Sequence, residues 1–196
     1  MKKFIALLLL IVTCVLMLSS CGQSTYYVEI SVVDYGKIIL KLDAETAPRT
    51  VKNFVNLVND GFYDGLTFHR VIYNFMIQGG DPNADGTGSS KKKIVGEFAN
   101  NGYVNNISHK RGVISMARGD DMNSASCQFF ICNADSPHLD GNYAAFGYVI
   151  EGMEVVDKIT VRTMFYAQDG VIKNKEYQAK IEYIKVLENY QETQNQ

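Results

Sequence analysis

Alternating apolar and polar positions open the folded part of the chain. Residues 28–32 read Val, Glu, Ile, Ser, Val, a repeat of two that predicts a β-strand with one buried face. The turn-forming residues 34–36 follow, and the mainly apolar segment 37–42 comes next. Two such segments around a short turn predict a β-hairpin.

The spacing of apolar residues then changes to that of a helix. Pro48 suits the first turn of a helix, where its missing N–H costs nothing. Four apolar residues from Val51 to Val58 fall at i, i+3, i+4 and i+7, which makes one buried stripe. Asp60-Gly61 should end this helix. The segment 151–159 predicts a second, shorter one.

The rest of the chain consists of short segments rich in aromatic and β-branched residues. Asp-Gly pairs, which favour turns, occur at 60–61, 64–65, 85–86, 140–141 and 169–170. The strand-like segments are 66–72, 75–78, 112–116, 127–134, 144–150 and 179–187. Seven or eight short strands and two helices predict a mainly β fold, an antiparallel barrel capped by the helices.

The first 20 residues have the layout of a signal peptide. Lys2-Lys3 precede an apolar run from Phe4 to Leu18, and Ser19-Ser20 form a small-residue cleavage site. Cys21 follows, and the site resembles a bacterial lipoprotein signal, which implies that Cys21 is lipidated. The alternative is an ordinary secretory cleavage site with a chance cysteine. We expect a tether over 21–26, one domain over 27–188 and a polar, disordered tail within 189–196.

Composition excludes several classes of protein. Removal of the signal peptide leaves 17 basic and 21 acidic residues, a net charge of −4. A nucleic-acid-binding protein would show a basic stripe instead, and Lys91–Lys93 is better explained as a solvated loop tip. No second apolar run reaches the ~18 residues that a membrane-spanning helix needs.

Common catalytic motifs are missing from the sequence. The only histidines are His69, His109 and His138, and no closely spaced His/Cys ligands predict a metal site. Cys127 and Cys132 lie an odd number of residues apart on a predicted strand, so they should point to opposite faces and not form a disulfide. If the chain is an enzyme, we expect no metal, no cofactor and no covalent nucleophile.

Three polar residues interrupt strands that are otherwise apolar. Arg70, Gln78 and Gln128 each stand within two residues of a Phe or Met. Any one of them could simply face solvent. Together they favour a shared groove with an apolar pocket and a few fixed polar groups, a common form of binding site.

The segment Phe68-His69-Arg70-Val71-Ile72-x-x-Phe75-Met76-Ile77-Gln78-Gly79-Gly80-Asp81 strongly resembles the signature of the cyclophilin-type peptidyl-prolyl cis-trans isomerases. Further matching strings extend the resemblance over residues 27–187. They are Gly61-Phe62-Tyr63-Asp64-Gly65, Gly86-Thr87-Gly88, Gly96-Glu97-Phe98, Ile114-Ser115-Met116-Ala117-Arg118, Ser126-Cys127-Gln128-Phe129-Phe130-Ile131 and Leu139-Asp140-Gly141. The resemblance implies a closed eight-stranded antiparallel barrel with a helix at each end.

The resemblance also implies a role for each site residue. Arg70 matches the catalytic arginine, and Gln78 a glutamine near it and the substrate backbone. The proline pocket is matched by Phe75, Met76, Phe130 and Leu139. The groove for the preceding residues is matched by Ala117, Arg118 and Gln128, with the backbone as the relevant group at 118. His69 matches a histidine beside the arginine, and Gly86 a glycine at the rim.

The sequence departs from the family pattern at three places. Tyr143 stands where many relatives have a histidine, Cys127 replaces a serine, and His138 replaces a tryptophan that cyclosporin binding uses. The resemblance therefore implies altered rate and weak cyclosporin binding.

The implied function is isomerisation of Xaa-Pro bonds in exported polypeptides by a monomer. The enzyme would be anchored by lipid at the extracytoplasmic face of a bacterial cell membrane. The alternative is an anchored peptide-binding module or holdase with little isomerase activity.

Overall fold

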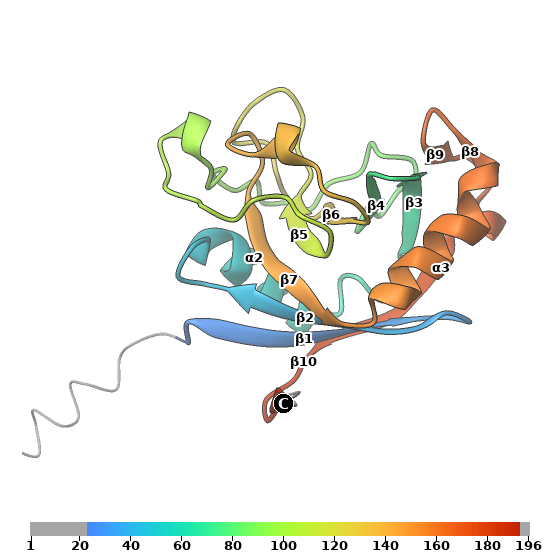
Figure 1. The fold of residues 1–196 in the computed structure, drawn as a ribbon, viewed down its shortest axis with the longest axis horizontal. Helices are drawn as coiled ribbons and strands as arrows, with labels where there is room; N and C mark the ends of the chain where they lie inside the picture. The colour runs from blue at the N-terminus through green and yellow to red at the C-terminus, as the bar shows by residue number, and fades with distance from the viewer. Residues whose placement is uncertain (1–22, 193–196) are drawn as a thin grey trace, which may run out of the picture.

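A closed β-barrel dominates the computed structural model, which describes residues 23–192 (Figure 1). Ten strands form one sheet in the order β10-β1-β2-β7-β5-β6-β4-β3-β9-β8, and an additional β10–β3 pairing closes eight of them into a ring. The strands are β1 (Thr25–Val32), β2 (Gly36–Asp43), β3 (Thr67–Ile72), β4 (Met76–Gly79), β5 (Val113–Met116), β6 (Phe129–Cys132), β7 (Ala145–Glu151), β8 (Ala167–Gln168), β9 (Val171–Ile172) and β10 (Ala179–Val186).

Two α-helices lie on opposite sides of the barrel in Figure 1. Helix α2 (Pro48–Asn59) packs against β2 and β10, and α3 (Met153–Thr163) packs against β2, β3 and β4. Short 3-10 turns cover η1 (Ala99–Asn101), η2 (Pro137–Leu139), η3 (Met164–Tyr166) and η4 (Lys175–Tyr177). The eight-stranded antiparallel barrel with two helices confirms the predicted fold class.

The first hairpin follows the predicted pattern. β1 and β2 pair antiparallel from Thr25↔Asp43 to Val32↔Gly36. The apolar residues of the alternation point inward, and Ile30, Ile38 and Leu40 have no exposed surface. The glycines of all five Asp-Gly pairs have positive φ, the conformation for which the turn prediction relies on glycine.

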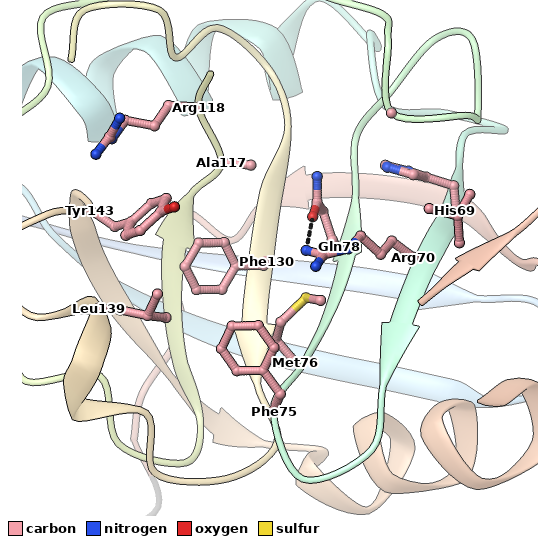
Figure 2. Close-up of a pocket in the computed structure, with 12 residues that line it drawn as sticks. His69, Arg70, Phe75, Met76, Gln78, Ala117, Arg118, Phe130, Leu139 and Tyr143 are labelled. Carbon is pink, nitrogen blue, oxygen red and sulfur yellow. Dashed lines mark hydrogen bonds between the residues drawn. The ribbon is translucent and has the colours of Figure 1, made fainter. Parts of the chain in front are cut away.

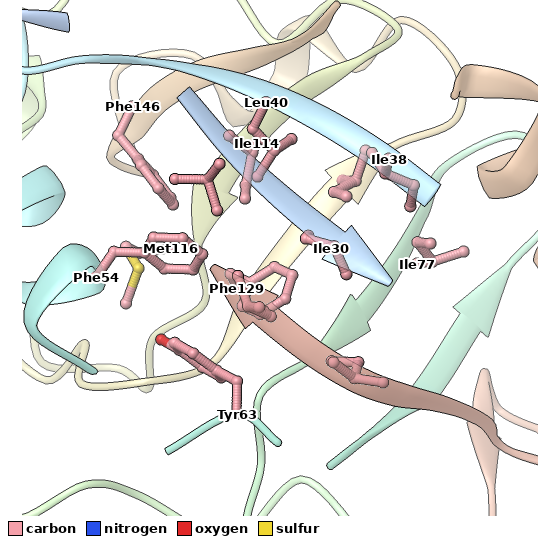
Figure 3. Close-up of a cluster of buried hydrophobic side chains, with 14 of the residues drawn as sticks. Ile30, Ile38, Leu40, Phe54, Tyr63, Ile77, Ile114, Met116, Phe129 and Phe146 are labelled. Atoms are coloured by element: carbon pink, nitrogen blue, oxygen red, sulfur yellow. The ribbon is translucent and has the colours of Figure 1, made fainter. Parts of the chain in front are cut away.

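The barrel core contains an aromatic cluster around Phe129 of β6, packed among aliphatic side chains (Figure 3). Phe54 of α2, Tyr63 and Phe68 meet the Phe129 ring nearly at right angles, with centroids 5.5, 5.6 and 6.1 Å away. Edge-to-face contacts of this kind stabilise a core beyond the area they bury. The hydroxyl of buried Tyr63 donates to the Cys127 carbonyl oxygen at 3.0 Å, so its polar atom is satisfied.

Helix α2 has no side-chain cap of its own, because Ala47 occupies the N-cap position. Glu97, which is 2% exposed, supplies the acceptors from a distant loop. Its Oε1 accepts from the Arg49 N–H at 3.1 Å, and its Oε2 accepts from the Thr50 N–H and hydroxyl at 2.8 and 2.7 Å. A carboxylate here satisfies free N–H groups at the positive end of the helix dipole.

We therefore expect Glu97→Gln to lower the free energy of unfolding by about 1–3 kcal/mol, because an amide NH₂ group would face N–H donors. Urea unfolding of the two proteins measures the difference. Glu45→Gln is the matched control, since Glu45 is an exposed acid whose side chain makes none of these bonds. Equal unfolding midpoints for wild type and Glu97→Gln would contradict this account of the cap.

The structure corrects the second helix and the tail. Helix α3 begins at Met153 rather than at residue 151, because Glu151 is still paired with Ile39 at the end of β7. Part of the predicted disordered tail is ordered: the Glu192 carboxylate accepts from the Tyr27 hydroxyl at 3.0 Å and lies 2.7 Å from the Lys41 ammonium. The remaining tail residues 193–196 lie outside the described residues.

The predicted signal peptide, 1–20, and the lipidation site Cys21 also lie outside the described residues. Within 23–192 no helix is both long and apolar enough to cross a membrane. Cys127 and Cys132 are free and buried, and they belong to different apolar clusters, as expected for side chains on opposite faces. The strand is shorter than predicted, since β6 begins at Phe129 and Cys127 lies before it.

Candidate active site

A cavity of about 330 Å³ opens on the outer face of strands β3, β4 and β6 (Figure 2). It brings together every site residue predicted from the sequence except Gln128, which lines an adjoining cavity. The lining residues are His69, Arg70, Phe75, Met76, Gln78, Gly86, Ala117, Arg118, Phe130, Leu139, Tyr143 and Val171. The volume lies within the range of small-ligand pockets.

Strand register places the polar groups of this cavity side by side. Arg70 of β3 pairs with Gln78 of β4. The Arg70 Nη1 donates to Gln78 Oε1 at 3.1 Å (Figure 2). Gln78 Nε2 donates to Gln128 Oε1 at 2.8 Å. Gln128 Nε2 donates in turn to the carbonyl oxygens of Gly86 and Gly88 at 3.1 and 2.8 Å. This chain of amides fixes the orientation of the guanidinium.

Arg70 keeps its charge in this setting. Partial burial lowers the pKa of its guanidinium, but arginine starts so high that the group stays cationic at neutral pH. Among the described residues, Nη1 is the only Arg70 side-chain atom with a hydrogen bond. The other N–H groups of the guanidinium can therefore donate to a ligand in the cavity.

Apolar side chains form the other half of the cavity. Met76, Phe130 and Leu139 are buried in a cluster separate from the barrel core, and Phe75, Ala117 and Tyr143 pack against it. The Phe130 and Tyr143 rings meet edge to face with centroids 5.9 Å apart. A small apolar ring could sit here with an arginine at its edge.

Comparison with known proteins identifies this arrangement. Residues 27–186 match the family model "Cyclophilin type peptidyl-prolyl cis-trans isomerase/CLD". The chain belongs to the cyclophilin family. It is 48% identical over 130 residues to peptidyl-prolyl cis-trans isomerase A of Dickeya dadantii, a match that covers 64% of this chain and 66% of that relative. It is 38% identical over 153 residues to isomerase ppi1 of Schizosaccharomyces pombe, which covers 78% of this chain and 90% of that one.

Solved structures agree with this membership. A cyclophilin-type isomerase of Cryptosporidium parvum, crystallised in the presence of the dipeptide Ala-Pro, superposes with a TM-score of 0.72 at 29% identity. The match covers 83% of this chain and 99% of that one. Cyclophilins are peptidyl-prolyl cis-trans isomerases, so the chain is an enzyme of that class.

A polar network around the buried His109 supports the apolar pocket of this cyclophilin, and sequence reasoning missed it. The His109 ring stacks on Phe130 with centroids 6.0 Å apart. Its Nδ1 lies 2.8 Å from an Asp140 carboxylate oxygen, and its Nε2 lies 3.0 Å from the Ser115 hydroxyl. Burial lowers the pKa of His109, which favours the neutral ring. His109 is 1% exposed, so it holds the pocket floor and does not reach a substrate.

His69 lies at the back of the cyclophilin groove and is fully buried. Neither of its ring nitrogens has a hydrogen-bond partner among the described residues, and burial lowers its pKa. A Cβ added at Gly86 would lie 3.9 Å from His69 Nε2, so the His69 ring lies beneath the loop that carries Gly86.

Val171 is the lining residue that sequence reasoning did not name. It comes from a small hairpin, β8–β9, that is attached to β3 through the Arg70↔Val171 pairing. The hairpin turn is Asp169-Gly170, and both residues have positive φ, as a two-residue turn of type I′ requires. The Asp-Gly pair predicts the turn, but the flanking strands have only two residues each, too few to show an alternating pattern.

Proposed function

We propose that this cyclophilin isomerises Xaa-Pro bonds with Arg70 as the catalytic group and Gln78 as its positioning residue. The observation that carries the proposal is the amide chain that fixes Arg70 at the edge of an apolar pocket. The proline pocket would consist of Phe75, Met76, Phe130 and Leu139.

The chemistry needs no bond to break. Rotation about a peptide bond meets a barrier of ~18–20 kcal/mol because the C–N bond is partly double. At the twisted state the prolyl nitrogen loses conjugation and gains a lone pair. A guanidinium N–H aimed at that nitrogen stabilises the twisted state more than either planar isomer, which is the condition for catalysis.

The apolar and the polar halves of the cavity have different roles. The apolar half would hold the proline ring while the acyl side of the bond turns, and Arg70 would act at the ring nitrogen. An acceleration of about 10⁵-fold requires only about 7 kcal/mol off the barrier. One oriented cation in a partly water-excluded site is of the right magnitude for that demand.

Magnetisation-exchange NMR on a short Xaa-Pro peptide tests the activity directly. We expect cis/trans exchange that takes tens of seconds or longer without enzyme to become fast at catalytic amounts of protein. Binding without acceleration would instead indicate the alternative function, a peptide-binding module or holdase.

We place this activity on exported polypeptides at the extracytoplasmic face of a bacterial membrane. The support is the layout of residues 1–20 and the cysteine at position 21. β1 begins at Thr25, so a lipid on Cys21 would hold the barrel close to the membrane. Two acyl chains are usually enough for stable anchoring.

We expect Cys21→Ser to move the protein from the membrane to the soluble or precursor fraction, because the residue that would carry the lipid is gone. Fractionation and metabolic labelling with a fatty acid measure the change. Cys14→Ser is the matched control, since Cys14 would leave with the signal peptide. Membrane association and labelling of Cys21→Ser at the level of the parent would refute the anchor.

Two further expectations accompany the function. We expect weak cyclosporin binding, because His138 stands where the resemblance places the tryptophan that cyclosporin binding uses. The His138 side chain is exposed, and its ring centroid lies 5.3 Å from that of Phe75. A monomeric state and the absence of nucleic acid as a partner also remain predictions.

A further inference from the structure

A second cavity of about 250 Å³ adjoins the proline pocket. The two cavities share Gln78, Gly86, Ala117 and Arg118, so a peptide chain in the first can continue into the second. Apart from Gln128, the remaining wall of the second cavity is made of small residues, the hydroxyl-bearing Thr87, Ser89, Ser124 and Ser126 among them. It can take a polar side chain, whereas the first takes an apolar ring.

The charged residues that line these cavities are basic. Arg70 lines the first cavity and Arg118 lines both, and no Asp or Glu is among the lining residues of either. The exposed lysines 91–93 follow just after Ser89. The chain as a whole carries a formal charge of −2, so the cationic groove is a local feature.

The acidic side chains on two neighbouring loops bond to groups of their own loops. The Asp85 carboxylate accepts from the Thr87 N–H and hydroxyl at 2.9 and 2.6 Å. The Asp121 carboxylate accepts from the Asn123 N–H at 2.8 Å. Asp120 is exposed, and the contact that Arg118 makes with it is to its backbone carbonyl oxygen.

Arg118 is held in place but retains a free donor. Its guanidinium carbon lies 4.9 Å from the Tyr143 ring centroid and 5.3 Å from that of Phe98, within cation–π distance of both rings. Its Nε donates to the Asn142 carbonyl oxygen at 2.9 Å and its Nη1 to that of Gly119 at 2.8 Å. No hydrogen bond from Nη2 to another described residue is present.

We propose that Arg118 determines substrate specificity and that this isomerase favours proline sites with an acidic side chain within two residues of the proline. The inference rests on the proposed function, since it assumes that the proline ring occupies the apolar pocket. An extended chain advances about 3.3–3.5 Å per residue, so a side chain one or two residues away is placed to reach the adjoining cavity. Its carboxylate would bind Arg118 Nη2, a charge-assisted hydrogen bond.

The test uses the full folded domain and a peptide series with Glu, Gln or Lys at each of the two positions before and after the proline. Exchange NMR gives kcat/KM for each peptide at low and high salt. At one position we expect Glu to exceed Gln by about fivefold, the size of a partly exposed charge pair, and Lys to fall below both. Added salt should shrink the difference.

Variants test whether the preference for Glu over Gln depends on the Arg118 side chain. In Arg118→Gln the Glu/Gln ratio should fall to about one, and Arg118→Lys should recover part of it because it restores the charge. Lys52→Gln, which removes one exposed positive charge on α2, should keep the wild-type ratio. A wild-type ratio near one at every position, or a ratio that Arg118→Gln leaves unchanged, would overturn the inference while the isomerase stands. Absence of acceleration for every peptide would overturn both.

Discussion

Replacement of Arg70 by alanine is expected to lower kcat by about 10²–10³-fold, the usual cost of removing one donor that stabilises a transition state. Peptide affinity should fall much less, because the bond to the prolyl nitrogen forms mainly in the twisted state. The fold should persist, since Arg70 is only partly buried and lies outside the barrel core. Steady-state kinetics with a protease-coupled assay measures the two effects separately.

The variant Arg70→Lys separates the effect of the positive charge from that of the guanidinium geometry. An ammonium on a flexible stem keeps the charge but cannot form the fork that bonds Gln78 and the substrate together, so little activity should return. Arg111→Ala is the control, because Arg111 pairs with Asp157 at 2.7 Å outside the groove and should keep the wild-type kcat. Full activity in Arg70→Lys would show that charge alone suffices and that the oriented fork is not required.

Truncation of the two adjacent phenylalanines on β6 should affect different properties, stability for one and substrate binding for the other. Phe129 points into the barrel, where three aromatic rings surround it, and Phe130 points into the groove. Phe129→Ala should lower the free energy of unfolding by about 3–5 kcal/mol through the cavity it leaves. Phe130→Ala should raise KM about tenfold or more, because it removes a wall of the proline pocket.

Unfolding by urea and kinetics at matched folded fraction separate the two effects. If Phe129→Ala does not fold, Phe129→Leu leaves a smaller cavity and should show the same direction with a smaller loss. A pair of variants with equal stability loss and equal KM would contradict the assignment of the two faces.

Much of the fold followed from local pattern in the sequence. The apolar stripe from Val51 to Val58 corresponds to one helix with the expected buried face. The alternation at 28–32 corresponds to a strand, but its polar residues Glu29 and Ser31 are buried as well, so both faces of that strand are covered. Such elements are predictable because the spacing of their side chains alone decides which face can be buried. The Asp-Gly turns were predictable for the same local reason.

Other features depend on contacts between distant segments. The Glu97 cap joins a loop to a helix 47 residues earlier, and the Asp140 carboxylate reaches His109 across 31 residues. The spacing of residues along the sequence does not predict contacts between segments so far apart. The polar residues Arg70, Gln78 and Gln128 stood out from the strand pattern, and the resemblance supplied the other site residues. Val171 and the free Nη2 of Arg118 needed the folded chain.

The central claim is that Arg70 stabilises the twisted prolyl bond, and the exchange rate of bound peptide tests it most directly. NMR exchange at saturating Xaa-Pro peptide would compare wild type with Arg70→Ala at equal folded fraction. The account predicts that the on-enzyme exchange rate falls by about 10²-fold or more while Kd changes only a few-fold. An undiminished on-enzyme rate in Arg70→Ala would contradict the mechanism.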